Sequence, residues 1–276
     1  MEVNKIDNLR KKAARIRLEA IRMVYEAGDG HPGPALSIAD ILTYLYFEEM
    51  NINPEEPEWS ERDRFVLSKG HGYCSYYAVL SERGYYGEPV KDFKLRCLNS
   101  PFQGHPVQGY VKGIDSTSGS LGNGLSIAGG MAKASKINKN SYNVYCITGD
   151  GELEEGSIWE GVNFGASQKL DNLFVFVDRN GWQSGDSVEA ILGMNNVEDR
   201  FQAFGWDTQV IEGHDFEELE RALDKAKTIK NKPHVIVCDD IKGKGVSFME
   251  NNNAWHKKTP TEEEYLIAKR ELSAEF

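Results

Sequence analysis

The feature that most restricts the fold is a series of short apolar runs separated by helical segments. The clearest runs are NVYCIT, NLFVFVD and HVIVCD, at residues 143–148, 172–178 and 234–239. Runs that are apolar at consecutive positions are typical of strands buried on both faces. Strands separated by helices pair in parallel through right-handed crossovers. We therefore predict a doubly wound α/β fold, with a mainly parallel sheet and helices on both of its faces.

The first segment has the periodicity of a long amphipathic helix. Apolar residues recur at steps of three and four positions from Ile6 to Ala27, so one face of a helix is buried. Asp7 is the expected N-cap, and Gly28 stands where the helix should end.

Further helices and strands continue the alternation to the end of the core. A second helix is predicted over 37–49 with Ser37 as its cap, and others after residue 71 and over 121–137, 152–168 and 216–229. Strands are also predicted at 64–68 and 206–211. Neither a repeat nor a linker interrupts the pattern, so residues 1–276 are expected to form one domain.

The composition excludes several classes of protein. A net charge of −11 leaves no excess of Lys and Arg for binding nucleic acid or an anionic membrane. No apolar stretch approaches the roughly 20 residues that span a bilayer, and the N-terminus has no apolar secretory core. The four cysteines form no CxxC pair, and Cys146 and Cys238 lie inside apolar runs, as free thiols in a reducing compartment do. We therefore expect a cytoplasmic protein.

The most informative motif is Gly149-Asp150-Gly151, at the end of a predicted strand and the start of a predicted helix. Glycines let the backbone turn sharply, and a helix N-terminus presents unpaired N–H groups to an anion. Asn180 follows thirty positions later, at the end of the next strand. Because ligands bind at the carboxyl ends of strands in open α/β sheets, Asp150 and Asn180 are expected to converge if their strands are neighbours.

A carboxylate, a carboxamide and a backbone carbonyl together form a site of hard oxygen ligands. Mg²⁺ in such a site, or Ca²⁺ or Mn²⁺ in its place, takes its remaining ligands from water and from phosphates of a bound molecule. Taken singly, Asp150 could be only a helix cap and Asn180 only a turn residue. The β-α-β unit between them favours the metal site.

GDG followed about thirty residues later by N resembles the thiamine-diphosphate fingerprint. The flanking blocks resemble transketolases in particular, and they occur in that family's order. These blocks are GDGHPGPALS at 28–37, DRFVLSKGHG at 63–72, FQGHPVQG at 102–109, GSLGNGLSIAGGMA at 119–132 and KGKGVSFMENNNAWH at 242–256. The resemblance implies the thiamine-diphosphate-binding fold, and within it the diphosphate-binding domain.

The resemblance also implies roles for individual residues. Catalytic or substrate-binding roles fall to His31, His105 and His256. Contacts with thiamine diphosphate fall to His71, Gly119, Leu121, Gly151, Asn180 and His256. The metal ligands are Asp150, Asn180 and the carbonyl of Trp182.

Four further positions complete these expectations. By the same resemblance, Glu155 and Glu160 match acidic positions at the contact between subunits, whereas His214 and His234 match no motif and are interpreted as structural. The loop after Asn180 departs from the family, because GWQSGDS replaces the usual continuation to an Asp-Gly pair. The geometry of the Trp182 ligand therefore depends on the shape of this loop.

Single-chain transketolases continue into a pyrimidine-binding domain and a C-terminal domain, which this sequence lacks. The resemblance therefore implies the N-terminal subunit of a split transketolase, assembled as two copies of each chain, a heterotetramer. Its reaction would be reversible transfer of a two-carbon ketol unit from a ketose phosphate to an aldose phosphate, with the pentose phosphate pathway as its setting. Two alternatives remain open: the cofactor-binding subunit of a split 2-oxo acid dehydrogenase or of a pyruvate/sugar-phosphate synthase, and a non-catalytic scaffold subunit.

Overall fold

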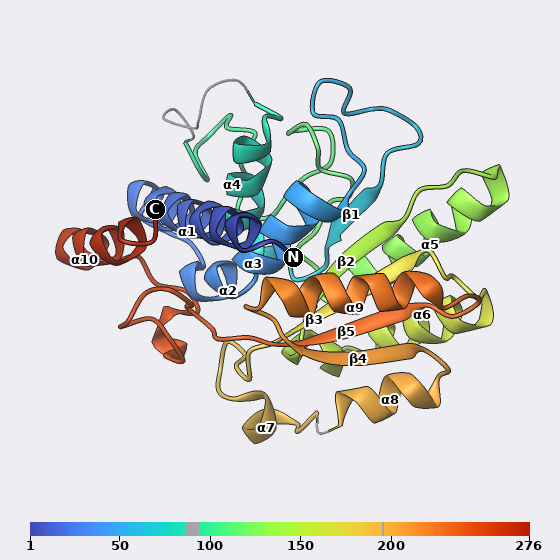
Figure 1. Cartoon of the computed structure of the whole chain (residues 1–276). Helices are drawn as coiled ribbons and strands as arrows, with labels where there is room; N and C mark the ends of the chain where they lie inside the picture. Colours follow the sequence, from blue (N-terminus) through green and yellow to red (C-terminus); the bar gives the residue numbers. More distant parts are fainter. Residues whose placement is uncertain (87–93, 195) are drawn as a thin grey trace.

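The computed structural model describes residues 1–86, 94–194 and 196–276. Its centre is a five-stranded sheet in which every neighbouring pair of strands is parallel. The spatial order is β1-β2-β3-β5-β4 (Figure 1). The strands are β1 (Arg64–Leu67), β2 (Val144–Gly149), β3 (Leu173–Arg179), β4 (Asp207–Glu212) and β5 (His234–Asp239).

The order of the strands explains which helices cover which face of the sheet. Along the sequence from β1 to β4, each new strand lies further toward the same edge of the sheet. The crossover helices α5 (Asn123–Asn138), α6 (Gly156–Ser167) and α8 (Val197–Ala203) therefore pack on the same face. The step from β4 back to β5 runs the other way, so its helix α9 (Phe216–Thr228) lies on the opposite face. Right-handed crossovers require this change of face.

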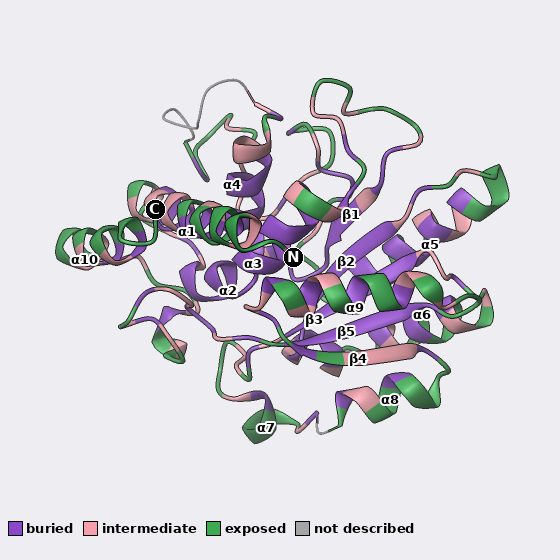
Figure 2. Ribbon diagram, viewed as in Figure 1, coloured by how far each residue is buried: buried purple, intermediate pink, exposed green. Residues whose placement is uncertain are grey.

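The central strands β2, β3 and β5 are buried on both sides, as the apolar runs predicted. In β3, Phe174 and Phe176 point into the core under α9, while Val175 and Val177 point into the core under α5 and α6. All four are at most 1% exposed. Figure 2 shows the central strands as a buried layer, with exposed residues on the outer faces of the helices and in the loops, and with β4 at the edge of the sheet only partly buried. The predicted doubly wound α/β fold is therefore confirmed.

Helix α1 (Val3–Ala27) ends where it was predicted to end but begins earlier. Gly28 has the left-handed conformation (φ 70°) that favours glycine, and its N–H caps the helix. The prediction of Asp7 as N-cap was wrong, because Glu2 holds that position. Met1 packs against the core and its ammonium group pairs with Glu220 (3.1 Å), so the helix is anchored one turn before Asp7.

The helix predicted over 37–49 is broken into shorter pieces. This part of the chain forms α2 (Pro32–Ser37), α3 (Ala39–Tyr44) and a wider turn at Leu45–Glu49. Ser37 ends α2 rather than capping a helix, and its hydroxyl donates a hydrogen bond to the carboxylate of Asp178 (2.8 Å). The apolar pattern marked buried residues correctly but did not reveal these breaks.

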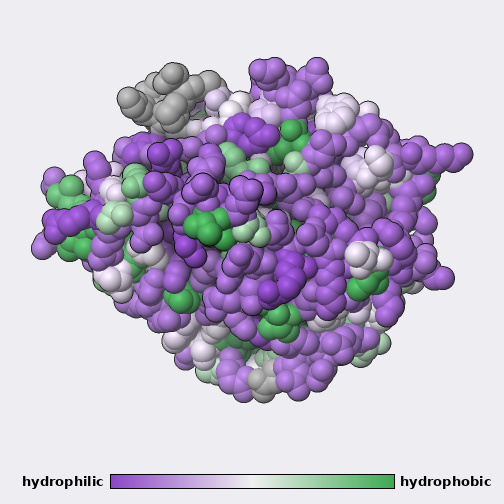
Figure 3. Space-filling model, viewed as in Figure 1, coloured by the Kyte–Doolittle hydropathy of each residue, from purple (hydrophilic) through white to green (hydrophobic). Residues whose placement is uncertain are grey.

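Further helices surround this framework on both faces of the sheet. Helix α4 (Tyr73–Arg83) follows β1, a short α7 (Val188–Ile191) precedes α8, and α10 (Glu262–Ser273), which was not predicted, packs against α1. In the described ranges no helix is long and apolar enough to cross a membrane. On the face drawn in Figure 3, hydrophilic residues dominate and hydrophobic ones form small separate spots.

Candidate active site

A cavity of about 520 Å³ opens at the carboxyl ends of the strands. It is lined by residues that follow β1, β2 and β3, by the start of α2, and by loops near residues 105, 119 and 256. Each of the ten residues for which the resemblance implied a catalytic, cofactor or metal role lines this cavity: His31, His71, His105, Gly119, Leu121, Asp150, Gly151, Asn180, Trp182 and His256. Their roles stay predictions, but the fold brings them all to one place.

Asp150 and Asn180 meet because β2 and β3 are neighbours in the sheet. Both side chains are buried, and Asp150 accepts hydrogen bonds from the backbone N–H groups of Gly151 (2.8 Å) and Gly181 (2.6 Å). No ion pair found among the described residues involves this carboxylate. Burial, together with the nearby charge of Asp178, raises the pKa of Asp150 to about 7. A buried carboxylate in this setting suits a bound cation.

The segment after Asp150 differs from the prediction of an immediate α-helix. Residues Gly151–Glu154 form a 3₁₀ turn, which Asp150 caps through its bond with the Gly151 amide. Helix α6 begins only at Gly156, so the free N–H groups of its first turn do not follow directly on the motif. Asp150 therefore both caps this turn and lines the cavity.

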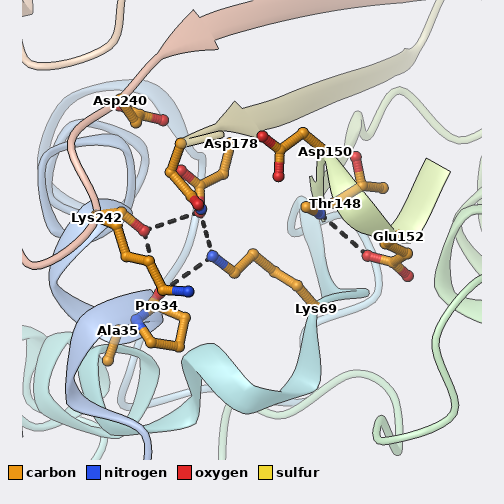
Figure 4. Close-up of polar contacts among 12 residues, drawn as sticks. Pro34, Ala35, Lys69, Thr148, Asp150, Glu152, Asp178, Asp240 and Lys242 are labelled. Carbon is orange, nitrogen blue, oxygen red and sulfur yellow. Dashed lines mark hydrogen bonds and ion pairs between the residues drawn. The ribbon is translucent and has the colours of Figure 1, made fainter. Parts of the chain in front are cut away.

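A buried ion pair between Lys69 and Asp178 holds the side chain of Asn180 in place. Asp178 accepts hydrogen bonds from Asn180 Nδ2 (2.8 Å) and from the buried ammonium of Lys69, which also bonds the carbonyl of Pro34 (3.1 Å). Figure 4 shows Lys69 reaching toward Asp178, with Asp240 nearby. Burial alone would raise the pKa of Asp178, but Lys69 outweighs it and holds that pKa below the usual range. The amide of Asn180 thus has a fixed orientation.

A second buried carboxylate, Glu152, ties together three elements around the cavity. Its oxygens accept hydrogen bonds from the N–H of Gly122 (2.8 Å), from the N–H of Gly149 (3.1 Å) and from the hydroxyl of Ser68. These three residues precede α5, end β2 and follow β1. Glu152 therefore fixes the walls of the cavity relative to one another.

Four histidines gather at the other side of the cavity. The ring centre of His31 lies 6.0 Å from that of His71, 6.3 Å from that of His105 and 5.8 Å from that of His256. The rings of His71 and His256 are 5.3 Å apart. The four come from the start of α2, from the turn after β1 and from two loops, so only the tertiary structure assembles them.

These histidines are neutral at physiological pH. Burial lowers the pKa of His31 to about 4 and that of His256 to about 3, with neighbouring positive charges adding to the effect. The pKa values of His71 and His105 are also lowered, mainly by burial. A neutral imidazole offers one donor and one acceptor, which suits hydroxyl groups and proton exchange.

Lys242 determines which nitrogen of His256 carries the proton. Its ammonium donates to His256 Nδ1 (3.0 Å), to Asn253 Oδ1 (2.7 Å) and to the carbonyl of Gln183 (3.3 Å). Because an ammonium group can only donate, the neutral imidazole of His256 carries its proton on Nε2. Burial lowers the pKa of Lys242 to about 8.

The loop after Asn180 closes on itself in a compact form. Gly181 takes a positive φ of 79°, and backbone bonds join Gln183 N–H to the carbonyl of Asp186 (2.8 Å) and Val188 N–H to that of Gly181 (3.0 Å). Although the GWQSGDS loop departs from the family pattern, its Trp182 still lines the cavity. Gly151 lies so close to Gln183 that a Cβ there would meet its Cγ at 2.6 Å.

The sequence did not single out four buried residues of the site: Lys69, Glu152, Asp178 and Lys242. Lys69, Glu152 and Lys242 stand within or beside the recognised motifs, and charged residues at the ends of apolar strands were a signal that could have found them. In the described residues no group of three or more His, Cys, Asp or Glu side chains could hold a metal by itself.

Four further residues with predicted roles are Glu155, Glu160, His214 and His234. Glu155 lines the cavity and Glu160 is exposed on α6, so the structure leaves their predicted contact between subunits untested. His214 bonds Asp40 (2.7 Å) and His234 bonds Asp207 (3.1 Å), which fits structural roles for both histidines.

Comparison with known proteins identifies the family. The model of the thiamine-diphosphate-binding domain of transketolase matches residues 9–275. One of the subunits of the apulose-4-phosphate transketolase of Phocaeicola vulgatus is 39% identical over 97% of this chain and 95% of its own length. The 6-deoxy-6-sulfo-D-fructose transketolase subunit SqwG of a Clostridium species is 41% identical over 100% of this chain and 99% of its own.

Longer transketolases match only in part. Human transketolase is 39% identical over 92% of this chain, which corresponds to 40% of the human protein. The crystal structure of Campylobacter jejuni transketolase superposes with a TM-score of 0.91 at 33% identity, over 99% of this chain and 43% of that one. The chain thus spans about two fifths of these relatives. It belongs to the transketolase family, the transferases of two-carbon ketol units, and carries that family's thiamine-diphosphate-binding domain.

Proposed function

We propose that this chain is the cofactor-binding subunit of a two-subunit transketolase, and that residues 1–276 form one diphosphate-binding domain. The reaction is the reversible transfer of a two-carbon ketol unit from a ketose phosphate to an aldose phosphate. One observation carries the proposal: the oxygen ligands at the ends of β2 and β3 and the four neutral histidines line the same cavity.

Thiamine diphosphate, when bound, supplies the carbon nucleophile for attack on the ketose carbonyl. Asp150, Asn180 and the carbonyl of Trp182 would hold Mg²⁺ beside its diphosphate. His71, His256 and the amide of Gly151 would donate hydrogen bonds to the diphosphate. Gly119 and Leu121 would lie against the aminopyrimidine ring.

His31 and His105 are the candidates for handling the sugar. As neutral imidazoles they can donate to one hydroxyl and accept from another, and pass a proton between them. Two buried polar atoms around them, His31 Nδ1 and Ser118 Oγ, find no hydrogen-bond partner among the described residues. Buried polar atoms are normally hydrogen-bonded, so these atoms suit a hydroxylated ligand.

A partner chain would complete the site. The relatives that match over nearly their whole length are named as subunits, and single-chain transketolases are more than twice as long as this match. The acid that activates the aminopyrimidine would come from the partner's pyrimidine-binding domain. We propose an assembly of two copies of each chain, a heterotetramer with two-fold symmetry, in which Glu155 and Glu160 lie at the contact between subunits.

The substrates belong to the class of ketose and aldose phosphates. One relative is named for apulose 4-phosphate and another for 6-deoxy-6-sulfo-D-fructose, so related subunits serve sugars with an anionic end. The pentose phosphate pathway is our proposal for the setting and the cytoplasm for the compartment. The cysteines that the structure describes are free thiols, which supports a reducing compartment.

Neither alternative is favoured by the comparisons. A split 2-oxo acid dehydrogenase or a pyruvate/sugar-phosphate synthase would share the GDG…N pattern, but the relatives above are transketolases. A scaffold subunit would not need four neutral histidines around a cavity with buried orphan atoms.

The test is reconstitution. The isolated chain should bind thiamine diphosphate with Mg²⁺ but transfer no ketol unit, and the addition of its partner subunit should restore transfer from a ketose phosphate. Transfer would be followed by coupled detection of the shortened aldose phosphate. Full turnover by the isolated chain, or turnover of pyruvate but not of ketose phosphate by the pair, would refute the proposal.

A further inference from the structure

A second buried carboxyl group lies beside Asp178, the aspartate that holds the side chain of Asn180. In the sheet, Asp178 of β3 is paired in register with Cys238 of β5. Asp240 stands two positions after Cys238, so it lies on the same face of the sheet as Asp178. Its backbone N–H donates to the carbonyl of Arg179 (3.2 Å), which continues the pairing of the two strands. Figure 4 shows the two aspartates next to each other.

The two carboxyl groups differ in the donors around them. Asp178 accepts three hydrogen bonds at Oδ2, from Ser37 (2.8 Å), Asn180 (2.8 Å) and Lys69, while its Oδ1 has no donor. The side chain of Asp240 is 0% exposed, and neither of its oxygens has a donor among the described residues. In the same ranges, no lysine or arginine forms an ion pair with Asp240. Asp178 is therefore surrounded as a carboxylate, and Asp240 is not.

His214 does not supply the missing donor. Its Nε2 lies 3.7 Å from Asp240 Oδ1, but this nitrogen accepts a hydrogen bond from the N–H of Ile241 (2.9 Å). The proton of the neutral imidazole is therefore on Nδ1, which donates to Asp40 (2.7 Å). Arg17 pairs with the same carboxylate of Asp40. The hydrogen of His214 thus points away from Asp240.

A proton on one of the two carboxyl groups resolves this arrangement. Asp178 and Asp240 lie within hydrogen-bonding reach of each other, and two ionised carboxylates can only accept. An unpaired buried charge is costly, and only Asp178 has donors that stabilise a charge. The proton therefore belongs on Asp240. Burial and then the charge of Asp178 raise the pKa of Asp240 well above its usual range, with Asp40 adding to the effect and Lys69 opposing it.

The turn after β4 closes one side of the Asp240 carboxyl. A Cβ at Gly213 would meet Asp240 Oδ1 at 2.1 Å and its Cγ at 2.8 Å, so the carboxyl packs directly against the glycine backbone. This contact leaves no space for a hydrated cation on that side. The unoccupied Oδ1 of Asp178 is an acceptor for the O–H of Asp240.

We propose that Asp240 is a positioning residue of the metal site, a neutral carboxylic acid whose O–H donates a hydrogen bond to Asp178 Oδ1. The carboxylate of Asp178 is then held at both oxygens, by Asp240 at one and by its three donors at the other. Because Asp178 accepts from Asn180 Nδ2, this fixes the direction of the Asn180 amide oxygen. The inference rests on the proposed function, in which Asn180 is a metal ligand.

The first test makes the same substitution at both members of the pair, in the complex with the partner subunit. Asp240→Asn keeps a donor for Asp178 and leaves the charge unchanged, so Mg²⁺-dependent affinity for thiamine diphosphate should stay within about 2-fold. Asp178→Asn removes the charge that balances Lys69, so the affinity should fall about 10- to 100-fold, as for loss of an outer-shell partner. Calorimetry measures both affinities.

Asp240→Leu separates the hydrogen bond from the shape of the side chain. Leucine has a similar size but no donor, so the affinity for thiamine diphosphate with Mg²⁺ should fall about 10-fold. Retention of affinity in Asp240→Asn together with its loss in Asp240→Leu supports a role for the donated hydrogen bond. An equal loss in both variants would show that Asp240 only fills space. Thermal melting confirms that each variant folds.

The pH dependence of melting, measured without cofactor, is a second readout. In the unfolded chain Asp240 ionises above a pH of about 3.9, whereas in the folded chain it keeps its proton, so it lowers the stability progressively as the pH rises. Asp240→Asn avoids this loss, so its melting temperature should exceed that of the unmodified chain by an amount that grows from about pH 5 to about pH 8. Asp239→Asn is the matched control at the exposed neighbour, and it should lower the melting temperature slightly, because Asp239 pairs with Arg179.

Infrared difference spectroscopy detects the proton directly. At neutral pH the unmodified chain should show the carbonyl stretch of a protonated carboxyl group that is missing from Asp240→Asn. The inference would be overturned if this band did not distinguish the two proteins, if the melting difference did not grow with pH, or if Asp240→Asn lost the cofactor as Asp178→Asn does. Ketol transfer by the wild-type complex is measured separately, so each of these outcomes leaves the proposed function standing.

Discussion

The two sides of the active-site cavity are built in different ways. On the sheet side, Asp150 and Asn180 directly follow neighbouring strands and are fixed by backbone N–H groups and by the Asp178–Lys69 pair. On the opposite side, the histidines come from loops and short helices far apart in the sequence, and His31 Nδ1 has no partner in the described structure. The sheet side offers the oxygens of a carboxylate and an amide, whereas the histidine side offers four neutral imidazoles.

This difference indicates a division of labour. A carboxylate held rigidly at strand ends can bind a cation and, through it, a diphosphate. Neutral imidazoles with unused hydrogen-bonding atoms can follow a hydroxylated substrate whose shape changes during the reaction. Variants of Asp150 and Asn180 should therefore abolish cofactor binding, while variants of His31 and His105, the two histidines assigned to the sugar, should change substrate kinetics.

The largest effect is expected from Asp150→Ala. Removal of the carboxylate would take away a proposed ligand of the metal, so Mg²⁺-dependent affinity for thiamine diphosphate should fall at least about 100-fold. Calorimetry with the cofactor, in the complex with the partner subunit, measures this. Asp199→Ala, which removes an exposed carboxylate on α8, is the control and should bind normally. Unchanged binding in Asp150→Ala would contradict the assignment of the sheet side to the metal.

The next largest effect is expected from Lys242→Met. Without the ammonium, His256 is no longer held with its proton on Nε2, and a cation near the expected diphosphate is lost. Cofactor affinity should fall about 10- to 100-fold, as for loss of a charged hydrogen bond. Calorimetry with thiamine diphosphate provides the measurement. Lys244→Met, at a half-exposed lysine of the same loop, should change the affinity less than about 2-fold.

A smaller effect, of a different kind, is expected from His105→Asn. Asparagine keeps one donor and one acceptor but shifts their positions, so KM for the ketose should rise about 10-fold. Affinity for thiamine diphosphate should stay within about 2-fold, since His105 is assigned to the sugar and not to the cofactor. Steady-state kinetics beside calorimetry distinguish the two quantities. If the cofactor were lost as readily as in Asp150→Ala, the division between the two sides would fail.

The smallest effect concerns pH. Burial lowers the pKa of His31 to about 4, below its unfolded value of about 6.5, so between these values the unfolded chain binds more protons than the folded one. The contribution of neutral His31 to the free energy of unfolding is therefore complete above about pH 6.5 and is lost as the pH falls toward about 4. His31→Asn should therefore show a smaller drop in melting temperature between pH 7 and pH 5 than the unmodified chain. An identical drop in both proteins would show that His31 titrates normally.

The sequence predicted the elements that periodicity controls and missed those set by contacts from elsewhere. The strands of 143–148, 172–178 and 234–239 were correct because apolar runs of that length can only be satisfied by burial on both faces. The helix over 37–49 was wrong in detail, because Ser37 is drawn to Asp178, a residue 141 positions away. The cap at Asp7 failed for the same kind of reason, since contacts of Met1 extend the helix.

For the candidate site, local motifs named residues but could not assemble them. Asp150 and Asn180 were predicted to converge because neighbouring parallel strands bring their ends to one edge. The supporting residues Lys69, Glu152 and Lys242 stand in the sequence as ordinary charged positions. Their position near the ends of apolar strands is a local signal, but their burial and their partners in other elements are set only by the tertiary structure.

The sequence by itself determined that this chain is an α/β protein with Asp150 and Asn180 at the ends of neighbouring strands, because periodicity and glycine placement act over short distances. Only the tertiary structure decided that four histidines from separate segments face that motif across one cavity. It also decided that the ammonium of Lys242 donates to His256 Nδ1. These arrangements arise from long-range packing, in which the position of each side chain depends on residues far from it in the chain.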